Sequence, residues 1–538
     1  MDEGLNFAAC VSRYTDRIDL MEMKSNVSHI AADSAELRGH IVDYWDQNQQ
    51  KYDHLLLAEK IKRIGLKVFE DIPLPDPDLF SPATSADRVD LAPDAVQPDS
   101  ADQALMFRSL TNIRVDLASF QPGSKLSFVD CSNLCLTCSQ DQIDSLEVSF
   151  QRVNEVSLEH IDAAQNAFFN FEDCVSIRVT ECSFRSSEGV PLTLLRCNTV
   201  LLSQLRFTGN RLCSIYIGCG CSNYVVQQCD FIGGQGKSNW HAPIVVSART
   251  LTTITSSLEG LLPDGYWARA EKISEMSLPP TRGFLVENKI SDSLSSGIYL
   301  DGAVNTVVES NSITGSSKEG ICLDYGCLNV TLFFNQILHN GDRYNKSDDD
   351  LAKDFVLQYG RCEDGSAKAK LPGISIDNSG FCSVVANQIC YNYGSGIKMV
   401  RAGIGNVIAN NSLMSNNQGR NDSFHFFGIE LGAASADVEA ADIDFAGSSF
   451  NVLSCNNIVG AHYAGLFIPG MCDDNLICDN VILRSESFSI EATEFNPSNR
   501  FLNNFSQENT RNCSLSLLRP VYAGSGFPVF DVIPEASR

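Results

Sequence analysis

Apolar and polar residues alternate along much of the chain after residue 104, which is the pattern of β-strands that bury one face. One five-residue phrase recurs there: Gly, an apolar residue, any residue, an apolar residue and any residue. It predicts a short strand, directly after a glycine, with two inward-facing side chains. Its six copies begin at Gly297, Gly320, Gly373, Gly396, Gly428 and Gly465.

A second phrase, of the type Asn-any-Ile, alternates with the first and sets a period. Successive copies are 23, 24, 52, 24, 45, 24 and 23 residues apart, so the two long gaps are one period plus an insertion. A fixed period of this length is typical of stacked repeats. We therefore predict an all-β solenoid with about 23–24 residues per coil and a column of asparagines at one corner. The copies begin at Asn288, Asn311, Asn335, Asn387, Asn411, Asn456, Asn480 and Asn503.

The spacing and the Asn-any-Ile strands resemble the right-handed parallel β-helix superfamily, which includes pectate lyases and polygalacturonases. The resemblance covers roughly residues 105 to 515. It implies a right-handed parallel β-helix. It implies a carbohydrate-related function less specifically, because the superfamily contains lyases, glycosidases, epimerases and non-catalytic binding proteins.

The flanking segments differ from the solenoid, predicted for residues 105–518. Residues 1–70 form an N-terminal segment with apolar residues at helical spacing from residue 28, and residues 71–104 are a linker rich in Pro, Asp and Ala. The helical segment would cap the open end of the solenoid or serve association, including oligomerisation. Residues 519–538 form a tail.

Three long insertions interrupt the regular coils, at residues 249–282, 339–370 and 416–449, and the third consists of two pieces, 416–427 and 433–449, on either side of the strand at Gly428. Long loops within a compact fold usually have a function. Each insertion begins or ends beside the same type of strand, the one that carries the glycine phrase. We therefore expect the insertions to form the walls of one groove.

Alternation within the glycine phrase predicts which side chains face this groove. Equivalent residues on successive coils should lie about 4.8 Å apart, so two outward columns form. The first contains Tyr299, Cys322, Ser375, Lys398, Glu430 and Phe467, and the second contains Asp301, Asp324, Asp377, Val400, Gly432 and Pro469.

Carboxylates dominate the candidate chemistry of these columns. Asp301, Asp324 and Asp377 on successive coils would oppose each other's ionisation unless a cation lay among them, so they suit acid–base catalysis or Ca²⁺ binding. Alternatively, an aspartate after a strand is simply a turn former. Lys398 and Glu430 complete the set of candidate catalytic residues. Lys398 would act as a base, or form an ion pair with Asp377 or Glu430.

Other side chains are candidates for contact with sugar rings or their substituents. Tyr299 and Phe467 have aromatic faces in the first column, and Trp240 precedes His241 at the edge of the groove. The same candidate set includes two residues close to the wall loops, Arg401 and His425.

Charge, apolar runs and cysteine content bear on the possible partners of the protein and on its location in the cell. The net charge of −26 argues against nucleic acid, which needs a basic footprint. No apolar run is long enough to span a membrane. The N-terminus lacks the features of a signal peptide, and many of the twenty cysteines occupy strand positions as small hydrophobes. The sequence therefore predicts a cytoplasmic protein with reduced thiols.

These observations favour a carbohydrate-active enzyme that acts on an oligo- or polysaccharide in the walled groove as a lyase, epimerase or glycoside hydrolase. No cofactor is required by this hypothesis, apart from a candidate Ca²⁺ site at Asp301, Asp324 and Asp377. The alternative is a non-catalytic module that binds a protein or a glycan.

Overall fold

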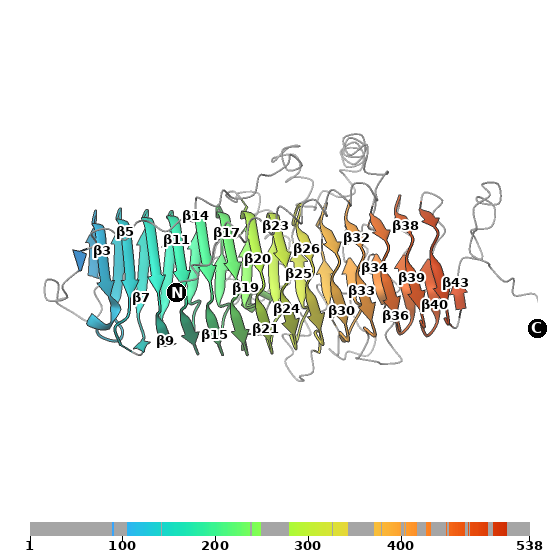
Figure 1. Ribbon diagram of the computed structural model, residues 1–538, viewed down its shortest axis with the longest axis horizontal. Helices are drawn as coiled ribbons and strands as arrows, with labels where there is room; N and C mark the ends of the chain where they lie inside the picture. Colours follow the sequence, from blue (N-terminus) through green and yellow to red (C-terminus); the bar gives the residue numbers. More distant parts are fainter. Residues whose placement is uncertain are drawn as a thin grey trace, which may run out of the picture.

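Strands of three parallel sheets stack along one long axis in chain order, as Figure 1 shows from blue at one end to red at the other. Each regular coil adds one strand to sheet B, then one to sheet A, then one to sheet C. The predicted all-β solenoid is confirmed. The computed structural model describes residues 89–90, 105–140, 142–236, 239–248, 279–324, 326–342, 371–377, 379–399, 403, 405–416, 427–431, 448, 451–468, 472, 474–492, 499–509 and 511–513.

Sheet A consists of β1 (Val89–Asp90), β3 (Thr111–Asp116), β5 (Ser132–Thr137), β8 (Asn154–Glu159), β11 (Val175–Thr180), β14 (Asn198–Ser203), β17 (Ser222–Gln227), β20 (Thr281–Val286), β23 (Val304–Glu309), β26 (Thr331–Phe333), β29 (Ser383–Val385), β32 (Val407–Ala409), β35 (Val452–Ser454), β38 (Leu476–Cys478) and β41 (Arg500–Leu502).

Sheet B consists of β2 (Leu105–Arg108), β4 (Lys125–Val129), β7 (Glu147–Gln151), β10 (Phe168–Glu172), β13 (Leu192–Leu195), β16 (Ile215–Ile217), β19 (Ile244–Ser247), β22 (Ile298–Asp301), β25 (Ile321–Asp324), β28 (Ile374–Ile376), β31 (Ile397–Met399), β34 (Phe427–Leu431), β37 (Ala464–Ile468), β40 (Phe488–Ala492) and β43 (Arg511–Cys513).

Sheet C consists of β6 (Ile143–Asp144), β9 (Asp162–Gln165), β12 (Ser183–Arg185), β15 (Arg206–Thr208), β18 (Asp230–Ile232), β21 (Lys289–Ser291), β24 (Ser312–Thr314), β27 (Gln336–Leu338), β30 (Gln388–Cys390), β33 (Ser412–Met414), β36 (Asn457–Val459), β39 (Val481–Leu483) and β42 (Phe505–Gln507). Two short 3-10 helices, η5 (Leu117–Ser119) and η6 (Asn239–His241), complete the described elements.

The predicted asparagine column is a hydrogen-bonded ladder at the corner between sheets A and C. The Asn311 backbone N–H donates to Asn335 Oδ1 at 3.0 Å, and Asn311 Nδ2 donates to the same oxygen at 2.9 Å and to the Leu285 carbonyl at 2.8 Å. Each asparagine thus satisfies buried backbone groups of neighbouring coils. The last rung is Asn504, which accepts from Asn480, and not Asn503 as the phrase predicted. Asn503 is the outward residue of that corner, with φ of 50°.

Two further ladders, which the sequence analysis missed, occupy the other corners in the second half of the solenoid. At the corner between sheets C and B, Asn340 bonds to Asn392 and Asn392 to Asn416. At the corner between sheets B and A, the ladder is formed by Asn406, Asn451, Asn475 and Asn499.

The interior of the solenoid is apolar throughout, but its residues change along the axis. In the first coils phenylalanine rings stack along the axis; Phe207 lies between Phe184 and Phe231 at centroid distances of 5.1 and 4.9 Å. The same column continues as Ile290 and Ile313 in the later coils. Glycine recurs at the start of the sheet B strands because the coils approach closely there. A Cβ on Gly428 would lie 2.6 Å from the Gly465 carbonyl oxygen.

The boundaries predicted from the sequence need several corrections. Val89–Asp90, placed in the linker, forms β1 and pairs with β3. The insertion predicted to end at residue 282 ends earlier, because β20 begins at Thr281. The other two were predicted to begin too early, because Asn340 and Asn416 belong to regular coils. The segments predicted at 1–70 and 519–538 lie outside the described residues, as does the proposed association through the helices.

Candidate functional site on the outer face of sheet B

The structure places the predicted first column in register on the outer face of sheet B. Tyr299 pairs with Cys322 on the next coil, and the register continues through Ser375, Lys398, Glu430 and Phe467. In the second column Asp301 pairs with Asp324, and the Asp377 backbone N–H donates to the Leu323 carbonyl of the adjacent strand at 2.7 Å. Val400, Gly432 and Pro469 lie outside the described residues.

The three aspartates of the second column were expected to face an open groove, but their side chains are buried. Asp301, Asp324 and Asp377 are only 1%, 4% and 0% exposed. The expected exposure is therefore wrong. Near Asp301 one cause is visible: the Trp240 ring of η6 packs edge-on against Tyr299, with ring centroids 4.9 Å apart. An apolar layer thus lies outside the sheet, separate from the solenoid interior.

Hydroxyl groups bind two of these buried carboxylates. The Ser247 hydroxyl donates to Asp301 Oδ2 at 2.8 Å, and the Tyr299 hydroxyl donates to Asp324 Oδ2 at 2.9 Å. A buried charge is costly without such partners. Burial, and to a lesser extent the negative charge of Asp301, raises the pKa of Tyr216, which also hydrogen-bonds Ser247. Tyr216 therefore remains protonated at neutral pH.

Lys398 and Glu430 form an ion pair, as one of the two interpretations of the sequence predicted. Lys398 Nζ lies 2.8 Å from Glu430 Oε1, and the Ser395 hydroxyl lies 3.2 Å from Glu430 Oε2. The Lys398 side chain is 21% exposed and that of Glu430 is 4% exposed. The pair places a fixed charge of each sign on adjacent coils, with the ammonium nearer to solvent.

The candidate ring-binding residues divide into two groups. Trp240 and His241 lie on η6 at the edge of the apolar layer. Burial lowers the pKa of His241 to about 4, with smaller effects of Lys318 and Arg211, so its imidazole is neutral at pH 7. Phe467 is buried and stacks on Phe427 at 4.4 Å. Arg401 and His425 lie outside the described residues.

The outer column continues one coil beyond the residues that the sequence analysis selected. Phe467 pairs in register with Glu491, whose carboxylate accepts a hydrogen bond from the Tyr463 hydroxyl at 3.5 Å. Burial raises the pKa of Glu491. Tyr463 and Phe488 are partly exposed, with their rings edge-to-face at 5.7 Å. We call Tyr463, Phe488 and Glu491 the C-terminal acid–aromatic cluster.

A signal for this cluster was present in the sequence. Ser489 stands 24 residues after Gly465, where the next glycine of the phrase would be, and the apolar–any–apolar alternation is not interrupted. The glycine phrase therefore ends one coil before the repeat does. Glu319 was missed for another reason: it lies at the corner before β25, where it accepts from the Ser296 hydroxyl at 2.9 Å.

The next question is whether the described part of the chain offers ligands for a metal ion. Within it, no three His, Cys, Asp or Glu side chains gather where they could hold a metal ion. Asp301 and Asp324 instead have the hydroxyl partners given above. Calcium binding at the predicted aspartates stays a prediction.

Comparisons with known proteins complement this geometry. Residues 278–424 match the model of a family described as periplasmic copper-binding protein (NosD). The chain is a right-handed parallel β-helix protein. The match covers about a quarter of the chain, most of it in the coils that carry the asparagine ladders. A search of curated proteins finds no similar sequence.

Solved structures with similar folds include three proteins of known name. The periplasmic alginate epimerase AlgG is 13% identical, over 76% of this chain and 85% of its own, with a TM-score of 0.35. The A-module of the mannuronan C-5 epimerase AlgE6 of Azotobacter vinelandii is 10% identical, over 75% and 88%, with a TM-score of 0.27. Tailspike protein 3 of bacteriophage CBA120 is 10% identical, over 74% and 51%, with a TM-score of 0.32.

The match to a periplasmic family points away from the cytoplasmic location predicted from the sequence, and that prediction is wrong. The inference from cysteine content failed for a physical reason. All seventeen cysteines whose side chains are described are free, and most are buried. Burial raises the pKa of Cys182 to about 12. Thiols that do not ionise react slowly with oxidants, so their reduced state does not require a reducing compartment.

One further structural test concerns membranes. Neither of the two described helices has the length and apolar character needed to cross a bilayer.

Proposed function

We propose that this protein is a carbohydrate-active enzyme that acts on an oligo- or polysaccharide along the outer face of sheet B, as a lyase, epimerase or glycoside hydrolase. The observation that carries the proposal is the C-terminal acid–aromatic cluster. It combines a half-buried carboxyl group with two partly exposed rings, two coils from the ion pair of Lys398 and Glu430.

Each part of the cluster has a chemical role in this proposal. Glu491, whose pKa is raised by burial, is protonated to a higher pH than an exposed glutamate and suits general acid catalysis. The Tyr463 and Phe488 rings offer apolar faces to the C–H faces of sugar rings. Lys398 offers a positive charge near solvent to an anionic or hydroxylated substituent.

The buried aspartates have a supporting role in the same proposal. Asp301 and Asp324 orient Ser247 and Tyr299 through the hydrogen bonds described above. Asp301, Asp324 and Asp377 are buried, so they could act in catalysis or bind Ca²⁺ directly only if the side chains that cover them moved aside. We include this movement on ligand binding in the proposal.

The test replaces Glu491 with Gln, which keeps the shape but removes the proton donor. Turnover would be measured on uronate and neutral oligosaccharides by assays for unsaturated products, for epimers and for reducing ends. We expect Glu491→Gln to lose a hundredfold or more of the wild-type rate, as is usual for loss of a general acid. The control Glu486→Gln removes an exposed carboxylate of the same coil and should keep full activity. Equal rates in the two variants would contradict the role of Glu491.

The burial of the three aspartates favours a second candidate function. A module that binds a glycan or a protein without catalysis would need no accessible carboxylate at these positions. Saturable binding of an oligosaccharide by the wild type, with no turnover on any substrate of the panel, would establish this alternative.

A further inference from the structure

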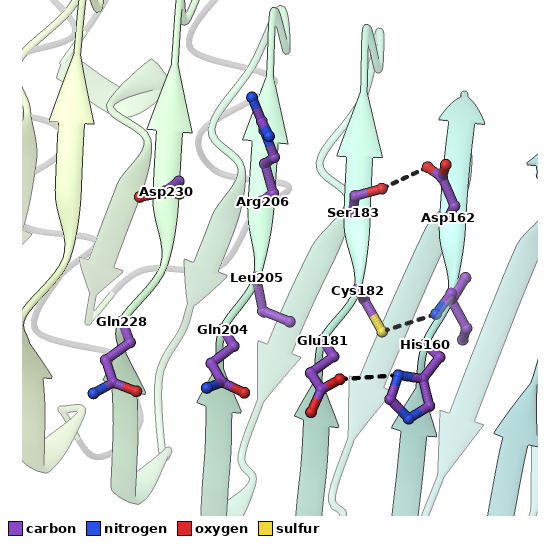
Figure 2. Close-up of a pocket in the computed structure, with 11 residues that line it drawn as sticks. His160, Asp162, Glu181, Cys182, Ser183, Gln204, Leu205, Arg206, Gln228 and Asp230 are labelled. Carbon is purple, nitrogen blue, oxygen red and sulfur yellow. Dashed lines mark hydrogen bonds and ion pairs between the residues drawn. The ribbon is translucent and has the colours of Figure 1, made fainter.

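A shallow groove lies at the corner between sheets A and C in the first half of the solenoid, and Figure 2 shows the residues that line it. The C-terminal acid–aromatic cluster lies in the second half, many coils away along the axis. The volume of the groove is about 750 Å³. One wall consists of the outward corner residues that follow β8, β11, β14 and β17. These residues have φ between 53° and 56°, so each turns its side chain out of the coil; they are His160, Glu181, Gln204 and Gln228.

The other wall consists of the first residues of four sheet C strands, which are Asp162, Ser183, Arg206 and Asp230. These four lie in register on successive coils. Neighbouring coils are about 4.8 Å apart. The groove therefore presents a pair of polar side chains at each step along the solenoid axis, as Figure 2 shows.

The four steps of the groove differ in how many hydrogen bonds and ion pairs their side chains already make. At the first two steps His160 Nδ1 lies 3.1 Å from Glu181 Oε2, and Asp162 is bound by Ser183 and Arg185. At the third step Gln204 and Arg206 are exposed, and among the described residues none bonds to their side chains. At the last step Gln228 Nε2 donates to Glu287 Oε2 at 3.0 Å. Gln204 and Arg206 are therefore available for a ligand.

The lining excludes several ligand classes. Nucleic acid and polyuronates require a positive footprint, whereas the groove carries three carboxylates, Asp162, Glu181 and Asp230, against the guanidinium of Arg206. Apolar small molecules bind in pockets lined mainly by hydrophobic side chains, and here both walls are polar. Amide, hydroxyl and guanidinium groups instead match a ligand whose hydroxyls both donate and accept hydrogen bonds.

We propose that this groove binds an extended neutral glycan along the solenoid axis, at a site separate from sheet B. The Gln204 amide donates to one hydroxyl and accepts from another. Arg206 donates from its guanidinium to ring or hydroxyl oxygens, and the carboxylates of the groove accept from further hydroxyls. The site holds the chain without chemistry, so its existence does not depend on the proposed catalytic function.

The test measures binding of neutral β-1,4-linked hexasaccharides of glucose, mannose and xylose by calorimetry, with a hexauronate for comparison. We expect the wild type to bind at least one neutral chain and to bind it more tightly than the hexauronate. Arg206→Ala should weaken this binding tenfold or more and Gln204→Ala severalfold. The control Arg282→Ala removes an exposed arginine of sheet A and should bind as the wild type does.

Three outcomes would overturn the proposal: no binding of any neutral chain, tighter binding of the hexauronate, or equal affinities in Arg206→Ala and the wild type. Its failure is distinguishable from failure of the catalytic proposal. Arg206→Ala should keep any turnover at sheet B on short substrates, and Glu491→Gln should keep binding that depends on Arg206. All variants would be compared by thermal melting to confirm that they fold.

Discussion

The first half of the solenoid, through β19, and the second half, from β20, share the same three sheets but occupy their corners with different side chains. Where the second half has asparagine between sheets A and C, the first half has Cys182, Leu205 and Cys229. The Cys182 Sγ lies 3.2 Å from the Thr180 carbonyl and 3.4 Å from the Ile161 nitrogen. The same backbone corner therefore accepts asparagine, a weakly hydrogen-bonding cysteine or an apolar leucine.

The two halves also differ in what fills the interior. Stacked phenyl rings such as Phe150 and Phe171, 4.7 Å apart, occupy the first half, and isoleucines occupy the second. Large rings bury more apolar surface per residue. In the first half, the apolar surface buried by the aromatic rings thus offsets the weaker hydrogen bonds at the corners. One coil geometry can therefore be stabilised in two ways.

The outer face of sheet B changes along the same axis. In the first coils its middle column contains Ser127, Ser149 and Asn170, all partly exposed, whereas Tyr299 and Ser375 of later coils are fully buried. The candidate catalytic chemistry therefore belongs to the second half and the proposed glycan groove to the first.

The largest expected effect comes from breaking an asparagine ladder. Asn335→Ala removes the acceptor of the Asn311 N–H and side-chain amide and the donor to the Val308 carbonyl. Each buried group left unsatisfied costs about 1–3 kcal/mol, so we expect a loss of about 4–6 kcal/mol in the free energy of unfolding. Urea denaturation, supported by hydrogen exchange of the affected coils, would measure it.

The matched variant in the first half is Cys182→Ala. It removes one small buried group with weak hydrogen bonds, so we expect a loss of about 1–2 kcal/mol. Similar losses in Asn335→Ala and Cys182→Ala would show that the corner chemistry does not distinguish the two halves.

The second prediction concerns the phenyl stack. Phe207→Ala should lower the free energy of unfolding by about 3–5 kcal/mol, because it leaves a cavity between Phe184 and Phe231. Phe207→Ile introduces the residue type of the second half and should recover more than half of that loss. If isoleucine were no better than alanine in urea unfolding, the two interiors would not be interchangeable solutions.

The last prediction is pH-dependent and concerns His241. Its pKa is about 4 in the folded protein and about 6.5 when unfolded, because burial opposes protonation beside Lys318 and Arg211. Between these values the unfolded chain binds more protons, so this contribution to stability is present above pH 6.5 and is lost as the pH falls toward 4. The loss is at most about 3 kcal/mol. His241→Gln, compared with the wild type by urea unfolding at pH 7 and 4.5, should lack this component.

Much of the architecture could be predicted because steric and hydrogen-bonding demands recur in every coil. Gly428 and Asn335 each satisfy such a demand, and their period was visible. The ladders beginning at Asn340 and Asn406 were missed because each is short and lies beside an insertion, where the period is obscured. The first half was harder to align because Cys182 and Leu205 perform the corner role without a shared residue type.

The sequence predicted which way the side chains of the candidate site point, but not whether solvent reaches them. Alternation correctly placed Tyr299 and Asp301 outside the solenoid interior. Periodicity within a strand carries no information about a distant segment that covers its outer face, so the contact of Trp240 with Tyr299 could not be foreseen. Glu491 was missed because Ser489 replaces the expected glycine.

The asparagine ladder also reveals how this molecule can change over evolutionary time. Asn335 and Asn387, 52 residues apart in sequence, bond at 2.9 Å, the same distance as Asn311 and Asn335, which are 24 residues apart. Asn411 and Asn456, separated by 45 residues, bond at 3.0 Å. Extra length inserted beside sheet B therefore leaves the rungs unaltered. Natural variation, or an engineer who grafts new loops at these positions, can diversify the surface while the inherited framework persists.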